Sequence, residues 1–303
     1  MTESIGRLGD QSAVRRLTLD DTIFTYVVDG STTVSTDAFF PAVPIVYWAT
    51  HPEALDSRQR VAMSTGGLLV ERAGSKLMVN AGYGELSGDT GLSAVNCGEF
   101  LTVLSALGVD SGEIDTLAFT PLHVDHTGWA FTRTEDGYLS KTFPDARYLL
   151  SDREWRPFLN GERPVGAPPH DTLVEPLAGV RTLIQDGEEV APGVVAVVTP
   201  GHSAGHTSYI VTTCTGKRLV AFGDIFHTPI QLTHRDWLSI PDVDSDGVLQ
   251  ARARIVDELT QPNTFGFGVH FGDQPFGRVI RRPDGKPQWV PTLSTELLPA
   301  PRP

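Results

Sequence analysis

The sequence predicts one layered α/β domain. Short β-branched segments bounded by Gly, Asp or Pro recur along its 303 residues, and a few segments between them carry apolar residues at helical spacing. The sequence has no internal repeat and no composition shift that would mark a linker between two domains. A chain of this length buries about three quarters of its unfolded surface, and strands mixed with helices build such a core in layers.

Several segments are expected to be strands because they are short, β-branched and end at turn-forming residues. They are 22–28, 67–71, 76–79, 115–119, 147–150, 194–199, 207–212, 218–222 and 265–269. The expected helices are 95–107, 151–159 and 248–259. Gly108 is a suitable stop for the first helix, and Asp246 and Pro262 are a cap candidate and a terminator for the last.

The domain is expected to span residues 61–282. Residues 1–60 are interpreted as an N-terminal extension packed on the core, because Phe39, Phe40 and Trp48 crowd together there. Prolines are frequent after Arg282, so residues 283–303 are expected to form a loosely packed tail. The whole chain is thus expected to be a single structural domain.

The composition excludes some partners. With 24 Lys and Arg against 37 Asp and Glu, the net charge is −13, and no basic cluster is present, which argues against nucleic acid and anionic membranes. The sequence shows neither a secretion-signal pattern nor an apolar run of membrane-spanning length. The 2 cysteines lie far apart, which favours a reducing cytoplasm.

Histidine and aspartate residues follow successive expected strands at the point where each strand ends. The motifs are His123-Val124-Asp125-His126, Pro200-Gly201-His202-Ser203-Ala204-Gly205-His206, Gly223-Asp224 and Val269-His270. A metal site at one edge of a sheet needs this arrangement, because imidazole and carboxylate ligands suit Zn²⁺, Mn²⁺ or Fe²⁺. A lone histidine is usually structural, but the ordered set is much more specific.

This ordered set resembles the metallo-β-lactamase superfamily over about residues 67–279. The stretches 126–129, 142–148 and 223–231 resemble the branch of methyl parathion hydrolase-like and N-acyl-homoserine-lactonase-like enzymes. The resemblance implies a four-layer αββα sandwich with one or two metal ions at the sheet edge. It also implies a metal-dependent hydrolase whose nucleophile is an activated water.

The resemblance implies a role for each matching residue. His123 and His202 would bind the first metal, and Asp224 would bridge the two ions. Asp125, His126 and His270 would bind the second. Asp125 and Asp224 are accordingly the expected catalytic residues, and Asp125 would orient the water or carry its proton.

The sequence departs from the family pattern at two positions. The family motif HxHxDH has its first histidine where this chain has Pro121, which offers no ligand atom. Asn80 stands where the family has an aspartate that supports the metal loops. Losing such support costs about 10–100-fold in metal affinity or activity. The site is therefore expected to be modified, with a single ion or a weak first site.

Trp129, His227 and Trp48 are expected substrate-binding residues, although His227 also fits a role in bracing Asp224. His206 is interpreted as structural. His170, in a Gly/Pro-rich loop, is a candidate replacement for the missing ligand, although exposure at the surface is the simpler expectation.

Three functions remain open. The first is a metal-dependent hydrolase of an ester, lactone or related bond in a small, fairly apolar molecule, with zinc as the preferred ion and manganese or iron as alternatives. The second is a non-hydrolytic enzyme of secondary metabolism on the same fold, performing a cyclisation, lyase or oxygen-dependent step. The third is a binding protein with a degenerate site. A homodimer is a further expectation. A serine hydrolase is disfavoured because the sequence has no GxSxG motif.

Overall fold

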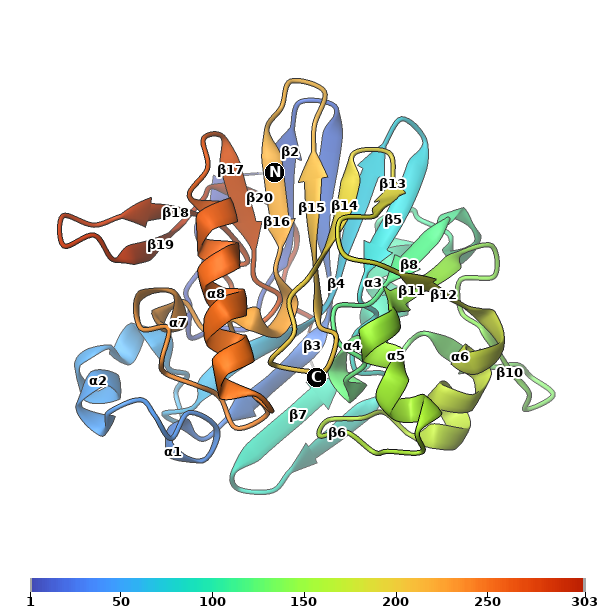
Figure 1. The fold of residues 1–303 in the computed structure, drawn as a ribbon, viewed down its shortest axis with the longest axis horizontal. Helices are drawn as coiled ribbons and strands as arrows, with labels where there is room; N and C mark the ends of the chain where they lie inside the picture. Colours follow the sequence, from blue (N-terminus) through green and yellow to red (C-terminus); the bar gives the residue numbers. More distant parts are fainter. Residues whose placement is uncertain (1, 302–303) are drawn as a thin grey trace.

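The computed structural model describes residues 2–301 and consists of two β-sheets with helices outside them (Figure 1). The larger, 11-stranded sheet has the order β1-β20-β2-β3-β4-β5-β8-β11-β12, with β7 paired to β3 and β6 paired to β7. Its strands are β1 (Glu3–Ser4), β2 (Val14–Leu19), β3 (Thr22–Val34), β4 (Val61–Arg72), β5 (Ser75–Val79), β6 (Leu86–Asp89), β7 (Ser93–Cys97), β8 (Thr116–Ala118), β11 (Arg147–Ser151), β12 (Arg181–Ile184) and β20 (Ser294–Leu298).

The second, 7-stranded sheet has the order β13-β14-β15-β16-β17-β18-β19. Its strands are β13 (Glu189–Ala191), β14 (Val194–Val198), β15 (Thr207–Thr212), β16 (Arg218–Ala221), β17 (Thr264–Phe267), β18 (Phe276–Arg281) and β19 (Pro287–Pro291). A separate hairpin joins β9 (Phe131–Arg133) and β10 (Leu139–Lys141).

Apart from α4 (Val124–Thr127), which lies at the edge where the two sheets meet, the α-helices lie outside the sheets (Figure 1). The α-helices are α1 (Thr36–Phe39), α2 (Ile45–Thr50), α3 (Phe100–Ala106), α4 (Val124–Thr127), α5 (Asp152–Leu159), α6 (Glu175–Val180), α7 (Ile230–Thr233) and α8 (Ser245–Leu259). Helices α3, α5 and α6 pack on the larger sheet, and α8 packs on the second. This arrangement confirms the α/β class and the expected αββα layers.

The main core lies between the two sheets. Tyr26 of β3 packs edge-on against Phe267 of β17, with ring centroids 5.1 Å apart. Its hydroxyl donates to the carbonyl oxygen of Val269 at 2.7 Å. The core contact between the sheets therefore also fixes the backbone directly before His270.

The N-terminal region differs from the expectation of an extension. Strands β2 and β3 are internal members of the larger sheet, and β3 pairs with β4 along most of its length. The sequence did not indicate β2, because several of its residues are polar. In the structure one of them, Arg15, is almost completely buried and pairs with Asp273. Only α1, α2 and their flanking loops lie beside the sheets, where Phe40 and Trp48 form a small core of their own.

The C-terminal region is also more ordered than its prolines suggest. Strand β20 lies between β1 and β2 in the larger sheet. Strand β19 forms the edge of the second sheet, and an edge strand tolerates the prolines at both of its ends. Residues 283–303 therefore contribute strands to both sheets, and the boundary expected at 282 falls inside a hairpin.

Two expected helices begin elsewhere. Residues 93–97 form β7, because their backbone pairs with Gly30–Val34 of β3, and α3 starts only after Gly98. Long-range pairing thus overrides the local helical spacing. The last helix is capped by the side chain of Asp244, not Asp246, which accepts a hydrogen bond from the Gly247 amide. Among residues 2–301, no helix combines the length and apolarity needed to cross a membrane.

Candidate metal centre

The strand ends carry the expected ligand residues to one place. Strands β14, β16 and β17 run in the same direction, so His202, Asp224 and His270 emerge at the same edge of the second sheet. His123, Asp125 and His126 follow β8 of the facing sheet, on and just before the short helix α4. All the residues expected as metal ligands therefore meet where the two sheets come together.

Asp224 is the centre of this cluster. Its Oδ2 atom lies 2.9 Å from His126 Nε2, 3.0 Å from His202 Nε2 and 3.7 Å from His123 Nδ1. Its Oδ1 atom lies 3.1 Å from His270 Nε2. One carboxylate thus faces imidazoles from both halves of the site with its two oxygens, as a bridging ligand must.

The cluster divides into two groups whose ligand atoms lie within 4.8 Å of one another, His123–His202–Asp224 and Asp125–His126–His270. In the second group, Asp125 Oδ2 lies 3.5 Å from Nε2 of both histidines. The Asp125 side chain is 23% exposed, whereas the other ligands are buried. Asp125 therefore stands at the accessible side of the centre.

The donor set fits divalent metal ions. Imidazole nitrogens, which bind a metal once they have lost their proton, converge on a buried carboxylate, and His123 Nδ1 lies 3.1 Å from His202 Nε2. Such a concentration of buried imidazole and carboxylate groups is costly to desolvate unless a cation joins them. Nitrogen and oxygen donors of this kind suit zinc, manganese and ferrous iron.

The electrostatics of the cluster are strongly perturbed. Burial alone would raise the pKa of Asp224, but the surrounding imidazoles, His126 first, outweigh burial and hold it well below its usual range. Burial also opposes protonation of His202, yet Asp224 and Asp242 together raise its pKa to about 10. Perturbations of this size mark functional sites more often than ordinary surface clusters.

Asn80 supports the loop that carries the ligands. It adopts a left-handed backbone conformation, with a φ of 66°, and its Nδ2 donates to Thr120 Oγ1 at 2.9 Å. The Thr120 amide donates back to Asn80 Oδ1 at 2.9 Å. The neutral amide thus holds the residue before Pro121 through both a donor and an acceptor.

His206 has the structural role expected for it. Its Nε2 accepts a hydrogen bond from the Asp224 amide at 3.0 Å, and its Nδ1 lies 2.9 Å from Thr199 Oγ1. Gly223 is required beside it, because its φ is 52° and an added Cβ would lie 2.6 Å from His206 Nε2.

The residues expected to bind substrate lie in different surroundings. Trp129 is buried, and its indole donates to Asp29 Oδ1 at 2.8 Å. Trp48 is buried against Phe40, and the Phe40 ring centroid lies 6.5 Å from that of His227. His227 is the one that joins the centre, with its Nε2 4.0 Å from Asp224 Oδ2. His170 is exposed.

Sequence reasoning missed three carboxylates that hold the site together. Glu154 of α5 accepts hydrogen bonds from the amides of Leu122 and Gly205, and so joins the two main ligand loops. Asp29 accepts from amides on both sides of β7 as well as from Trp129. Asp242 accepts from His202 Nδ1 at 2.9 Å. Each contact joins distant parts of the chain, so no local pattern could have indicated it.

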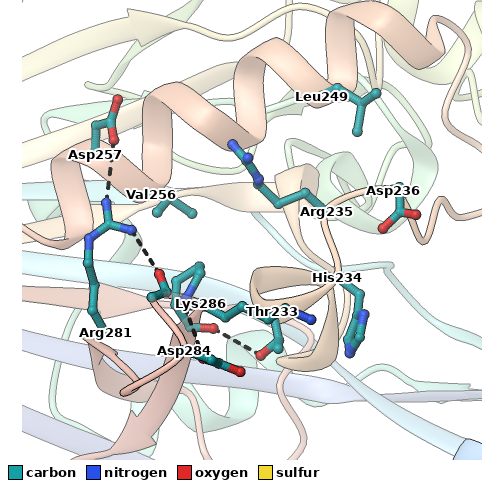
Figure 2. A pocket seen from close by; sticks show the side chains of 12 residues that line it. Thr233, His234, Arg235, Asp236, Leu249, Val256, Asp257, Arg281, Asp284 and Lys286 are labelled. Carbon is teal, nitrogen blue, oxygen red and sulfur yellow. Dashed lines mark hydrogen bonds and ion pairs between the residues drawn. The ribbon is translucent and has the colours of Figure 1, made fainter.

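Two cavities differ in their relation to the centre. A cavity of about 410 Å³ begins beside the metal loop, where Val124 and Thr127 line it together with Tyr83, Phe131 and Leu173. A larger one, of about 850 Å³, lies between α7, α8 and the β18–β19 hairpin (Figure 2). Its side chains carry charges of both signs. None of the metal ligands lines either cavity, but Val124 and Thr127 of the smaller one are adjacent in sequence to the ligands His123, Asp125 and His126. The smaller, more apolar cavity is therefore the better candidate for a substrate.

Comparisons with known proteins agree with this architecture. The hydrolase AbOPH of the beta-lactamase superfamily matches with a TM-score of 0.75 and 22% identity, over 93% of this chain and 98% of that chain. AidC, a dizinc quorum-quenching lactonase solved with N-hexanoyl-L-homoserine, matches with a TM-score of 0.75 and 18% identity, over 93% and 98%. A probable metal-dependent hydrolase from Staphylococcus aureus matches with a TM-score of 0.72 and 19% identity, over 91% and 99%.

Because the sequence identities to these solved structures are low, the comparisons establish only that the fold is shared. A comparison with proteins of curated function finds no significant match. The sequence pattern of the metallo-beta-lactamase superfamily matches residues 68–264, which include the ligands from His123 to Asp224. The chain belongs to the metallo-β-lactamase superfamily.

Proposed function

We propose that this protein is a metal-dependent hydrolase that cleaves an ester, lactone or related bond in a small, fairly apolar molecule. The observation that carries the proposal is the convergence of His126, His202 and His270 on the two oxygens of Asp224. Membership of a superfamily rich in metallohydrolases and likeness to a lactonase and to hydrolases support the proposal.

Two groups of side chains would hold metal. Asp125, His126, Asp224 and His270 form the more complete group, and His123, His202 and Asp224 form the other. Zinc is the ion that we expect, and manganese or iron fits the same donors. A divalent ion bound there lowers the pKa of a water molecule and polarises a substrate carbonyl.

The protein's own residues would then direct the hydrolysis. Burial opposes ionisation of Asp125, but the imidazole of His126 and that of His270 lower the pKa of its carboxyl, so Asp125 is an anion at neutral pH. From its partly exposed position it would accept a hydrogen bond from the attacking water and take its proton. The proton would pass to the oxygen of the leaving alcohol as the carbon–oxygen bond breaks.

Apolar side chains flank the centre where a substrate would lie. The ring of Phe39 on α1 packs 5.4 Å from that of His227, and the cavity beside α4 is lined by Tyr83, Phe131 and Leu173. Its volume of about 410 Å³ lies in the range of small-molecule sites. An acyl chain or another small apolar group would fit this environment.

The test is an assay of protein loaded with zinc, manganese or iron against aliphatic esters and lactones of increasing acyl length. We expect turnover of at least one substrate class, dependence on the metal, and loss of turnover in Asp224→Ala. Failure of every metal form on the whole panel, with the metal shown to be bound, would count against hydrolysis.

A second candidate rests on the composition of the two groups. The sets His123–His202–Asp224 and Asp125–His126–His270 each contain two histidines and one carboxylate, the combination that also supports non-haem iron enzymes using oxygen. An oxygen-dependent step in secondary metabolism is therefore the alternative. Iron in protein purified without added metal, together with substrate-dependent oxygen consumption, would favour it over hydrolysis.

A further inference from the structure

We propose that His227 is a ligand of the first metal and supplies the imidazole that Pro121 cannot. The inference rests on the proposed metal-dependent function and adds a ligand to the same centre. It assigns His227 a place in the metal centre instead of the substrate-binding role expected from the sequence.

The first group is one ligand short without His227. It contains His123, His202 and Asp224, whereas closed zinc sites have four protein ligands and catalytic sites have three plus an open position. Asp224 also faces His270 of the second group, so its negative charge would be divided between two ions. A further neutral donor would complete the first group without adding charge.

The Nε2 atom of His227 borders the first group. It lies outside the set of ligand atoms within 4.8 Å of one another there, so the ring would move toward the ion to become that donor. His227 Nε2 lies 4.0 Å from Asp224 Oδ2, close to the 3.7 Å between the same oxygen and His123 Nδ1. Ligand atoms around a tetrahedral zinc ion lie roughly 3.3–3.5 Å apart, given bond lengths of about 2.0–2.1 Å. The ring centroid of His227 is 5.0 Å from that of His202, close to the 4.7 Å between His123 and His202.

The Nδ1 side of the His227 ring is held by hydrogen bonds. His227 Nδ1 lies 3.0 Å from Ser239 Oγ, and the Ser239 hydroxyl also accepts from Gln231 Nε2 at 2.8 Å. Gln231 in turn accepts from the His227 backbone amide at 2.7 Å. When Nδ1 donates to Ser239, the lone pair of Nε2 faces Asp224, as metal-binding histidines require.

The neighbouring group His202–His227–Asp242 does not offer a separate ion site. The Asp242 carboxylate already accepts from His202 Nδ1 and from the Ser239 amide, and buried Arg252 lies 3.4 Å from it. These contacts neutralise Asp242 and leave it to orient the His202 ring. His227 is therefore available to the side of the centre that contains Asp224.

The experiment is a zinc titration of His227→Ala and His227→Asn against a competing chromophoric chelator, with thermal melting as a check of folding. We expect two zinc ions in the wild type, and loss of one ion or at least about a 10-fold weaker first site in the variants, which is the lower end of the effect of a lost supporting contact. The matched control is His170→Ala, which removes an exposed histidine and should bind zinc as the wild type does.

Pro121→His in the His227→Ala background supplies an independent check, because it returns an imidazole to the same half-site. Recovery of the second zinc ion would support the inference. Unchanged stoichiometry and affinity in both His227 variants would overturn it, even if the protein hydrolyses esters.

If neither His227 variant folds, the wild type loaded with cobalt still gives an answer. Paramagnetically shifted, exchangeable imidazole N–H signals should then appear for each of His123, His126, His202, His227 and His270. Absence of the His227 signal would contradict the inference, whereas absence of turnover with all the signals present would contradict only the proposed hydrolase function.

Discussion

Nδ1 of His202 donates a hydrogen bond to Asp242 at 2.9 Å, on the side of the ring opposite Nε2, which lies 3.0 Å from Asp224. The contact fixes both the tautomer and the orientation of a metal ligand. Asp242 is held in turn by the Ser239 amide and by Arg252, whose side chain is fully buried. A chain of polar contacts thus reaches from the metal centre to α8.

Asp242→Asn should weaken zinc binding by roughly 10–100-fold, because the amide is a poorer acceptor for His202 and leaves the charge of Arg252 uncompensated. Competition titration measures the effect, and Asp136→Asn, in an exposed loop, is the control. Wild-type affinity in Asp242→Asn would mean that packing alone orients His202.

Asp224→Ala should lower kcat/KM by about 10³-fold or more, since the bridging carboxylate contributes to both groups and metal catalysis is worth several kcal/mol. His126→Ala should have a comparable effect, because His126 Nε2 lies 2.9 Å from Asp224. Steady-state kinetics with matched metal content would check this, and Asp136→Asn should be unaffected. An Asp224→Ala enzyme with near-normal turnover would place the chemistry elsewhere.

Chelation should lower the melting temperature of the wild type. An ion that binds only the folded state at 100 times its Kd stabilises that state by about 2.7 kcal/mol. Differential scanning fluorimetry with and without chelator, followed by added zinc, measures the loss and its recovery. The matched control is Asp224→Ala, in which chelator should cause a smaller shift; equal shifts in both proteins would indicate a metal bound outside this centre.

We expect Trp129→Phe to lower the free energy of unfolding and to leave substrate binding nearly unchanged. The buried indole N–H donates to Asp29, and its loss leaves a buried acceptor with one partner fewer, at a cost of about 1–3 kcal/mol in the free energy of unfolding. Denaturant unfolding measures that cost, and KM should stay near the wild-type value. A raised KM at unchanged stability would instead support the substrate contact expected from the sequence.

The ligand cluster could be predicted because its residues directly follow short, β-branched strands with clear turn signals, as at His202 after β14 and His270 soon after β17. Other features depend on contacts between distant segments. Strand β2 could not be predicted because its sequence is too polar for a buried strand. The charge of buried Arg15 is paired with Asp273, which lies far along the chain. Residues 93–97 show helical spacing but pair with β3 instead.

Phe39→Ala should test the apolar wall of the centre. The Phe39 ring packs against His227 from α1 and is only partly buried, so we expect it to contact a bound substrate. Removing the ring should raise KM for long acyl substrates by roughly tenfold, which corresponds to about 1.4 kcal/mol of lost apolar contact. The effect should shrink for short substrates, because they do not reach the ring, and kcat should change little if the contact is equal in the ground and transition states.

Tyr138→Ala removes an aromatic ring that is 75% exposed and should leave both constants unchanged. An equal rise in KM for short and long substrates would contradict this role and would indicate that Phe39 acts only by holding His227 in place.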